Sequence, residues 1–138
     1  MTQSGLLFEP NTNGKSYLSI NYHRDGTADK SQWRITRELE HAIFCESDEN
    51  DWNDNDGHYW GHHDSGHTEL GTKGERICHF PLPTNLTDAW HGYPVSLNSE
   101  PLKRSQDRTR KFIRVVQMFE DDGLIEKTLS KRIRTGKI

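Results

Sequence analysis

A polar segment in the middle of the chain, residues 46–67, constrains the fold more than any other feature. Its 22 residues include seven carboxylates and four histidines but almost no aliphatic side chain. Because a core forms by removing apolar surface from water, we expect this segment to be an acidic, histidine-rich loop outside the core. Trp52, Tyr59 and Trp60 are the exceptions, and we expect them to hold one edge of the loop against the domain.

Composition favours a single folded domain over residues 1–138. The chain has only 27 Leu, Ile, Val and Phe residues, near the level at which chains tend toward disorder. However, the net charge of −3 gives little self-repulsion, and aromatic residues make up 9% of the chain, including four tryptophans. We therefore predict a small core with long ordered loops, which a partner or a second copy in a homo-oligomer could complete.

Local patterns predict strands on both sides of the polar segment and a helix directly before it. Residues 15–24 are rich in strand-favouring side chains and lie between two Gly-containing turn signals. Residues 31–45 place apolar side chains at helical spacing, although a strand remains an alternative there. Residues 69–82 indicate a hairpin or strand whose second arm is 76–80. Residues 84–100, rich in Pro, Gly, Asn and Ser, are expected to form an irregular loop.

The last part of the chain, residues 103–138, predicts a basic helical hairpin. Ser105 or Asp107 can cap a helix that carries one apolar stripe, and Gly123 can end it. Apolar residues then recur at near-helical spacing, which predicts a second helix packed on the first. The stripe of the first helix consists of Phe112, Val115, Val116 and Phe119. The predicted fold class is α+β, a small and mainly antiparallel sheet with this C-terminal helical hairpin.

Charge divides the chain into an acidic body and a basic tail. Residues 1–102 hold 7 Lys or Arg against 16 Asp or Glu, whereas residues 103–138 hold 11 against 5. The basic helices could bind nucleic acid, dock on the acidic body or simply face water. Walker loops, dinucleotide fingerprints and nucleophile elbows are missing from the sequence, which disfavours the familiar nucleotide-dependent enzymes.

The polar segment contains the side chains that bind cations. An EF-hand with Gly57 as its turn glycine would need oxygen ligands where Trp52 and His63 stand, so this calcium loop is excluded. Histidines four residues apart suit a divalent transition metal such as zinc, nickel, manganese or iron, but nearby glycines argue against a helix and require a site built on a loop. The candidate ligands are His58, His62, His63, His67 and Asp64, with Asp56 as a substitute for Asp64.

A second set of candidate residues lies after the polar segment. If residues 76–80 form a strand beside the loop that follows, His79 and His91 could act as acid and base toward a phosphodiester, with Lys or Arg from the tail holding the phosphate. Hydrogen bonding that only supports the fold is the alternative role of these imidazoles. Cys78 is not expected to pair with His79, because adjacent strand residues point to opposite faces.

Two functions remain open at this point. The first is a non-enzymatic binding or regulatory protein that engages a macromolecule, in the first place a protein, through an acidic surface bearing aromatic side chains. Its candidate contact residues are Asp51, Trp52, Asp54, Asp56 and Trp60. The alternative is a small hydrolase, metal-dependent or histidine-based, that cleaves a phosphodiester.

Location is expected to be cytoplasmic. The first ten residues lack the basic start and long apolar run of a signal peptide, and the sequence shows no apolar stretch of membrane-spanning length. We therefore expect no membrane association, and we expect Cys45 and Cys78 to be reduced thiols.

Overall fold

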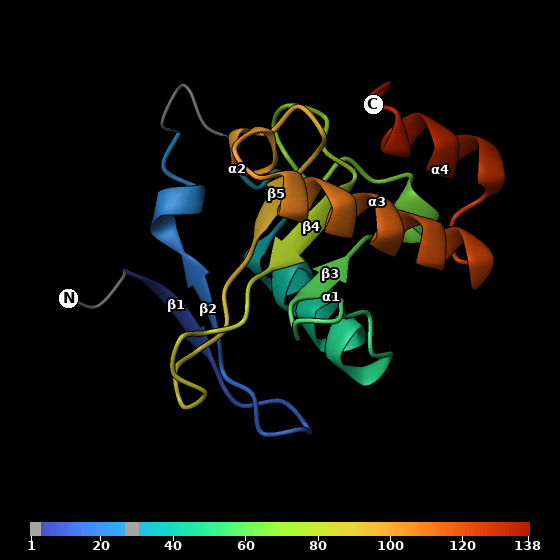
Figure 1. Cartoon of the computed structure of the whole chain (residues 1–138). Helices are drawn as coiled ribbons and strands as arrows, with labels where there is room; N and C mark the ends of the chain where they lie inside the picture. Colours follow the sequence, from blue (N-terminus) through green and yellow to red (C-terminus); the bar gives the residue numbers. More distant parts are fainter. Residues whose placement is uncertain (1–3, 27–30) are drawn as a thin grey trace.

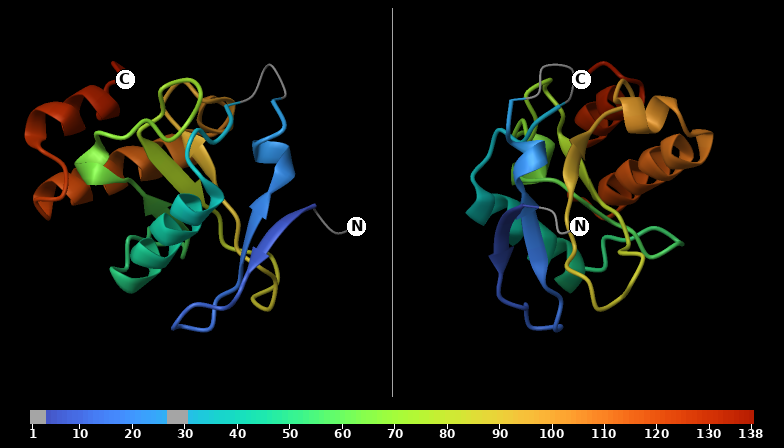
Figure 2. Two further views of the ribbon diagram at one scale, coloured as in Figure 1. Left: turned by 180° about the vertical axis from the view of Figure 1, so that it is seen from behind. Right: turned by 90° about the vertical axis from the view of Figure 1, so that its left-hand side faces the viewer.

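The structure, a computed structural model, describes residues 4–26 and 31–138. Its elements in chain order are β1 (Gly5–Phe8), β2 (Tyr17–Ile20), the 3-10 turn η1 (Asn21–His23), α1 (Arg37–Glu49), β3 (Tyr59–Gly61), the 3-10 turn η2 (Asp64–Gly66), β4 (Ile77–Phe80), β5 (Tyr93–Val95), α2 (Glu100–Lys103), α3 (Gln106–Asp121) and α4 (Lys127–Arg134). The fold class is α+β, as predicted. An antiparallel sheet in the order β3-β4-β5 lies between α1 on one face and α3 on the other (Figures 1 and 2).

The register of the central sheet separates two sets of side chains. Trp60 of β3 lies opposite His79 of β4, and His79 lies opposite Tyr93 of β5. Side chains of directly opposed residues lie on the same face, so these three form a row on the face that turns toward α3. Cys78 and Phe80 alternate with His79 and lie on the other face, against α1.

Two apolar clusters hold these layers together. The cluster on the α3 side joins the sheet to the predicted stripe of α3 and to α4, and its buried members include Trp60, Ile77, Val95, Phe112, Val115, Val116, Phe119, Ile125, Leu129 and Ile133. The cluster on the α1 side includes Tyr17, Ile43, Phe44, Tyr59, Phe80 and Trp90. The core therefore lies on the two faces of one short sheet, with mainly aliphatic side chains on the α3 side and mainly aromatic side chains on the α1 side.

The β1–β2 hairpin is held to α1 by a buried carboxylate. Glu40 of α1 is fully buried and accepts hydrogen bonds from Tyr17, from Ser19 at 2.7 Å and from Arg24 at 2.8 Å. A buried charge is tolerated only when it is paired and hydrogen-bonded, and Arg24 supplies the opposite charge. This network positions the hairpin and the following turn η1 beside the central sheet.

The two C-terminal helices are confirmed. Ser105 caps α3, its hydroxyl accepting from the backbone N–H of Arg108 at 3.1 Å, and α4 packs against α3 through the buried stripe. An ion pair between Glu120 and Arg134, at 3.0 Å, also joins the helices.

Other predicted boundaries need correction. The helix expected over residues 31–45 runs over 37–49, because Thr36 provides the N-cap by accepting from the N–H of Leu39. The loop expected over residues 84–100 contains β5. Pro94 is compatible with β5 because this strand lies at the edge of the sheet, where one side needs no donor.

The polar segment, residues 46–67, is not a loop outside the core. It contains the end of α1, all of β3 and the turn η2, and it buries Trp52 and Trp60. Its buried carboxylates accept hydrogen bonds, some of them from partners far away in sequence. Asp48, for example, accepts from Asn11 and Asn13 and pairs with Lys15, with all three contacts between 2.8 and 2.9 Å. The prediction failed because hydrogen bonding let polar side chains accompany aromatic ones into the interior.

Two further findings concern membrane-spanning helices and the state of the cysteines. Over the described ranges, no helix combines the length and apolar character needed to cross a membrane. Cys45 and Cys78 are both free thiols, and Cys78 is buried.

Candidate active site

A row of hydrogen-bonding side chains crosses the central sheet on its α3 face. His79, in the middle of β4, is only 1% exposed, and its Nδ1 lies 3.0 Å from the hydroxyl oxygen of Tyr93 on β5. The imidazole ring stacks on Trp60 of β3 with ring centroids 4.2 Å apart. The antiparallel register therefore fixes both the position and the orientation of His79.

The second ring nitrogen of His79 meets His58. The Nε2 of His79 lies 3.1 Å from the Nδ1 of His58, and the two rings are within 10° of parallel. His58 is half-buried and enters from the turn that precedes β3. A continuous chain of hydrogen bonds thus runs from His58 through His79 to Tyr93.

The turn that carries His58 is held by two aspartates. One carboxylate oxygen of Asp54 accepts from the backbone N–H groups of Asp56 and His58, and the other accepts from the Trp60 indole at 2.9 Å. Asp56 pairs with Lys111 of α3, which also binds Asp107 at 2.9 Å. The turn is therefore connected to both the sheet and α3.

Two further histidines lie beside this chain. His23 of η1 has its ring centroid 5.6 Å from that of Tyr93 and 6.3 Å from that of His91, which lies two residues before the start of β5. The Nδ1 of His91 is buried and has no hydrogen-bond partner in the described part of the protein. We call His23, His58, His79, His91 and Tyr93 together the histidine–tyrosine cluster.

Burial keeps much of the cluster neutral. The pKa of His79 is well below its usual range, mainly because of burial and also because of the nearby His58 and Arg108. Burial, followed by the proximity of His91, lowers the pKa of His23 to about 4. Burial also lowers the pKa of His91 and raises that of Tyr93. At neutral pH these groups carry no charge and can exchange protons without first losing one to solvent.

Arg108, in the first turn of α3, places a cation near the cluster. Its charge contributes to the lowered pKa of His79 and partly offsets the rise that burial causes in the pKa of Tyr93. Within residues 4–26 and 31–138, Arg108 forms no ion pair, whereas Lys111 is paired with two aspartates. Arg108 is therefore the better placed of the two to meet an anionic group of a ligand.

The hydrogen-bond chain has two arrangements of its protons. In the first, the Tyr93 hydroxyl donates to His79 Nδ1, and His79 Nε2–H donates to His58 Nδ1. In the second, His58 Nδ1–H donates to His79, and His79 Nδ1–H donates to the Tyr93 oxygen. The second arrangement leaves His58 Nε2 without a proton and the Tyr93 hydroxyl hydrogen free to be donated elsewhere. One neutral chain can thus present a base at one end and an acid at the other.

The predicted metal ligands are separated. His58 joins His79, whereas His62 is buried between Trp52 and Phe119, with ring centroids 4.5 and 4.6 Å away. Asp64 is exposed in η2, His63 precedes it, and His67 lines a groove beside α4. In the part of the chain that the structure describes, no three His, Cys, Asp or Glu side chains form a group that could hold a metal ion.

The predicted partner-binding residues also divide. Trp52 and Trp60 are 5% and 0% exposed, and Asp54 is 9% exposed and bound to the Trp60 indole, so an exposed surface cannot include them as we expected. Asp51 and Asp56 are exposed, but Asp56 is engaged by Lys111. The acidic surface therefore does not carry the aromatic side chains that we predicted for it.

The predicted pair of His79 and His91 does lie in one region, since the proximity of His91 contributes to the lowered pKa of His79. Sequence reasoning missed His23 and Tyr93 as members of this site, and it indicated Arg108 only as one of the Lys or Arg residues of the tail. For Tyr93 a signal was available, the alternation of side chains around Pro94. A strand predicted from this alternation would have placed Tyr93 beside His79. No sequence signal indicated His23, which the β1–β2 hairpin brings into position.

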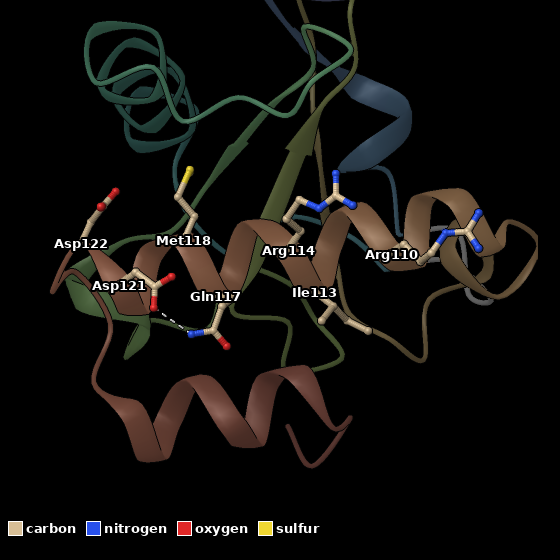
Figure 3. A pocket seen from close by; sticks show the side chains of 7 residues that line it. All are labelled: Arg110, Ile113, Arg114, Gln117, Met118, Asp121 and Asp122. Atoms are coloured by element: carbon tan, nitrogen blue, oxygen red, sulfur yellow. Dashed lines mark hydrogen bonds between the residues drawn. The ribbon is translucent and has the colours of Figure 1, made fainter.

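Two grooves on the described part of the surface lie away from this cluster. One shallow groove follows α3, where Arg110, Ile113, Arg114 and Gln117 are among the lining residues and Gln117 donates to Asp121 at 2.9 Å (Figure 3). Another lies between η2 and α4. Neither groove is lined by a member of the histidine–tyrosine cluster.

Comparisons with known protein families, with curated proteins and with solved structures give no match to this chain.

Proposed function

We propose that this protein cleaves a phosphodiester by acid–base catalysis at the histidine–tyrosine cluster. The observation that carries the proposal is the hydrogen-bond chain from half-buried His58 through buried His79 to Tyr93. Displacement at phosphorus near neutral pH needs a base for the attacking oxygen and an acid for the leaving oxygen. His58 and Tyr93 serve these two roles, while His79 is a positioning residue that links them.

The charges around the cluster support an anionic substrate. Arg108 forms no ion pair within the described ranges, and its charge acts on both His79 and Tyr93, contributing to the lowered pKa of the first and opposing the raised pKa of the second. Residues 103–138 carry 11 Lys or Arg against 5 Asp or Glu, so α3 and α4 extend this positive charge. A nucleic-acid strand fits this arrangement, with Arg108 holding the phosphate next to the acid and the base.

The test is cleavage of 5′-labelled RNA and DNA oligonucleotides by the purified full chain at pH 7, with and without EDTA. We expect at least one substrate to be cleaved in EDTA. We also expect His58→Ala to reduce the rate by about 10²- to 10⁴-fold, the usual contribution of a general acid or base. His67→Ala is the matched control, because His67 is exposed and lies outside the cluster.

Three outcomes would contradict the proposal. Intact substrates would favour the binding function instead, and an unchanged rate for folded His58→Ala would remove the base from the mechanism. Cleavage that EDTA abolishes and a divalent metal restores would favour the metal-dependent alternative.

A further inference from the structure

We propose that the substrate is RNA and that its ribose 2′-hydroxyl is the attacking nucleophile. This inference rests on the proposed function and concerns its substrate class. It follows from what the histidine–tyrosine cluster contains, namely groups that move protons, and from the environment of the nearby nucleophilic side chains.

Cys78 is the nearest nucleophile in sequence, but its side chain lies on the opposite face of the sheet from His79. It is fully buried in the apolar cluster on the α1 side, and burial raises the pKa of its thiol. A neutral thiol that is enclosed on the far face cannot reach a substrate bound near His58 and Arg108.

Tyr93 is also a poor nucleophile. Its hydroxyl is hydrogen-bonded to His79, and burial raises its pKa, so the phenol stays protonated near neutral pH. A protonated phenol can donate a hydrogen but cannot readily attack phosphorus. Over the described ranges, the hydrogen bonds of the His58 and His79 side chains lead to one another and to Tyr93, and to no serine, threonine or cysteine.

The remaining oxygen nucleophiles are a water molecule and a hydroxyl group of the substrate, and a ribonucleotide carries such a hydroxyl. Its 2′-hydroxyl is held next to the 3′-phosphate, so attack is intramolecular and benefits from a high effective concentration. The base then needs only to remove one proton, and the acid needs only to supply one.

The step balances without any further reactant. His58 Nε2 takes the 2′-hydroxyl proton, the 2′-oxygen forms a bond to phosphorus, and the bond from phosphorus to the 5′-oxygen breaks. The Tyr93 hydroxyl gives its proton to the departing 5′-oxygen. His58 Nδ1–H then passes its proton to His79 Nε2, and His79 Nδ1–H passes its proton to the Tyr93 oxygen, which restores a neutral chain. The products are a 2′,3′-cyclic phosphate and a free 5′-hydroxyl.

The proton movement is the change from one arrangement of the hydrogen-bond chain to the other. Both contacts that it uses, at 3.1 and 3.0 Å, are within hydrogen-bonding distance. Because His79 remains neutral before and after the step, its burial does not oppose the reaction. The burial of His79 is consistent with a linking role and would be unfavourable for a histidine that had to remain charged.

The experiment compares three oligonucleotides of one sequence, made as RNA, as DNA and as 2′-O-methyl RNA. We expect the purified chain to cleave only the RNA, to leave 2′,3′-cyclic phosphate ends, and to act at least 100-fold more slowly on the other two. His58→Ala, purified in the same way, shows whether the cleavage belongs to this site.

The outcomes separate the two proposals. If DNA or 2′-O-methyl RNA is cleaved within tenfold of the RNA rate, and His58→Ala abolishes this cleavage, the inference about the 2′-hydroxyl is wrong and the proposed phosphodiester cleavage stands. RNA products that carry 5′-phosphates would also contradict the inference. If all three substrates stay intact, the proposed function itself fails.

Discussion

Acidification is expected to destabilise this protein through a buried histidine outside the histidine–tyrosine cluster. His62 is 5% exposed, stacks on Trp52 and contacts the edge of Phe119, and neither of its ring nitrogens has a hydrogen-bond partner within the described ranges. Burial, followed by the proximity of His63, lowers its pKa from 6.5 to about 4.

The sign of the pH effect follows from this difference in pKa. The unfolded chain takes up a proton at a higher pH than the folded chain, so the stability is fully present above pH 6.5. It is then lost as the pH falls toward 4. Linkage gives a loss of about 2.5 kcal/mol from His62 between pH 7 and pH 4.5, an order-of-magnitude value.

The variant His62→Phe keeps an aromatic ring between Trp52 and Phe119 and removes the proton site. We expect it to lose about 2.5 kcal/mol less stability than the wild type between pH 7 and pH 4.5. Urea denaturation at several pH values, followed by tryptophan fluorescence, measures this difference. Val116→Ala is the control, because it should lower stability by a similar amount at every pH.

Equal losses of stability on acidification in folded His62→Phe and in the wild type would show that His62 is not the source of the pH effect. A loss of several kcal/mol in His62→Phe at pH 7 would also contradict the prediction. Such a loss would mean that the ring nitrogens make hydrogen bonds that favour the fold.

Two further predictions concern the scaffold. Glu40→Ala should lower the free energy of unfolding by about 3–5 kcal/mol, because it leaves the charge of Arg24 without its partner. Denaturant unfolding should show that the double variant Glu40→Ala/Arg24→Ala recovers part of this loss. Gly61→Ala should lower the melting temperature, since its Cβ would lie 2.6 Å from Ile43 Cγ2. If this contact is the cause, Gly61→Ala should lower the melting temperature less in an Ile43→Ala background, which lacks Cγ2.

The parts of the fold that could be predicted depend on local interactions. The α3 helix was predicted because its apolar residues repeat every three or four positions and because Ser105 caps its first turn. Both signals lie within one stretch of sequence. The start of α1 was predicted less accurately. Apolar residues at helical spacing begin before Thr36, the residue that caps the helix.

The short strands and the interior of the polar segment could not be predicted in this way. The strands β3 and β5 have three residues each, too few to show a period. The buried position of Asp48 depends on Asn11 and Asn13, which are 37 and 35 residues away in sequence. Partners at such separations leave no local pattern.

The candidate site shows the same limit. The sequence indicated that His79 and His91 could lie near one another, and the structure brings both into one cluster. The pairing of His58 with His79 depends on the register of β3 against β4, and the contact of His79 with Tyr93 depends on the register of β4 against β5. A shift of one residue in either pair would turn these side chains to opposite faces.

The central claim is that His58 and Tyr93 act as the base and the acid at the two ends of one hydrogen-bond chain. The most direct test compares the folded variants His58→Ala and Tyr93→Phe on two substrates, a ribonucleotide dimer and a ribonucleoside 3′-(4-nitrophenyl) phosphate. Nitrophenolate leaves readily without a proton, so only the dimer requires the acid.

We expect Tyr93→Phe to slow cleavage of the dimer by about 100-fold or more, and to cleave the nitrophenyl ester at a rate within a few-fold of the wild type. His58→Ala should slow both reactions, because both need the base. If Tyr93→Phe loses the same factor in rate on both substrates, or if His58→Ala keeps full activity on either substrate, the assignment of acid and base is wrong.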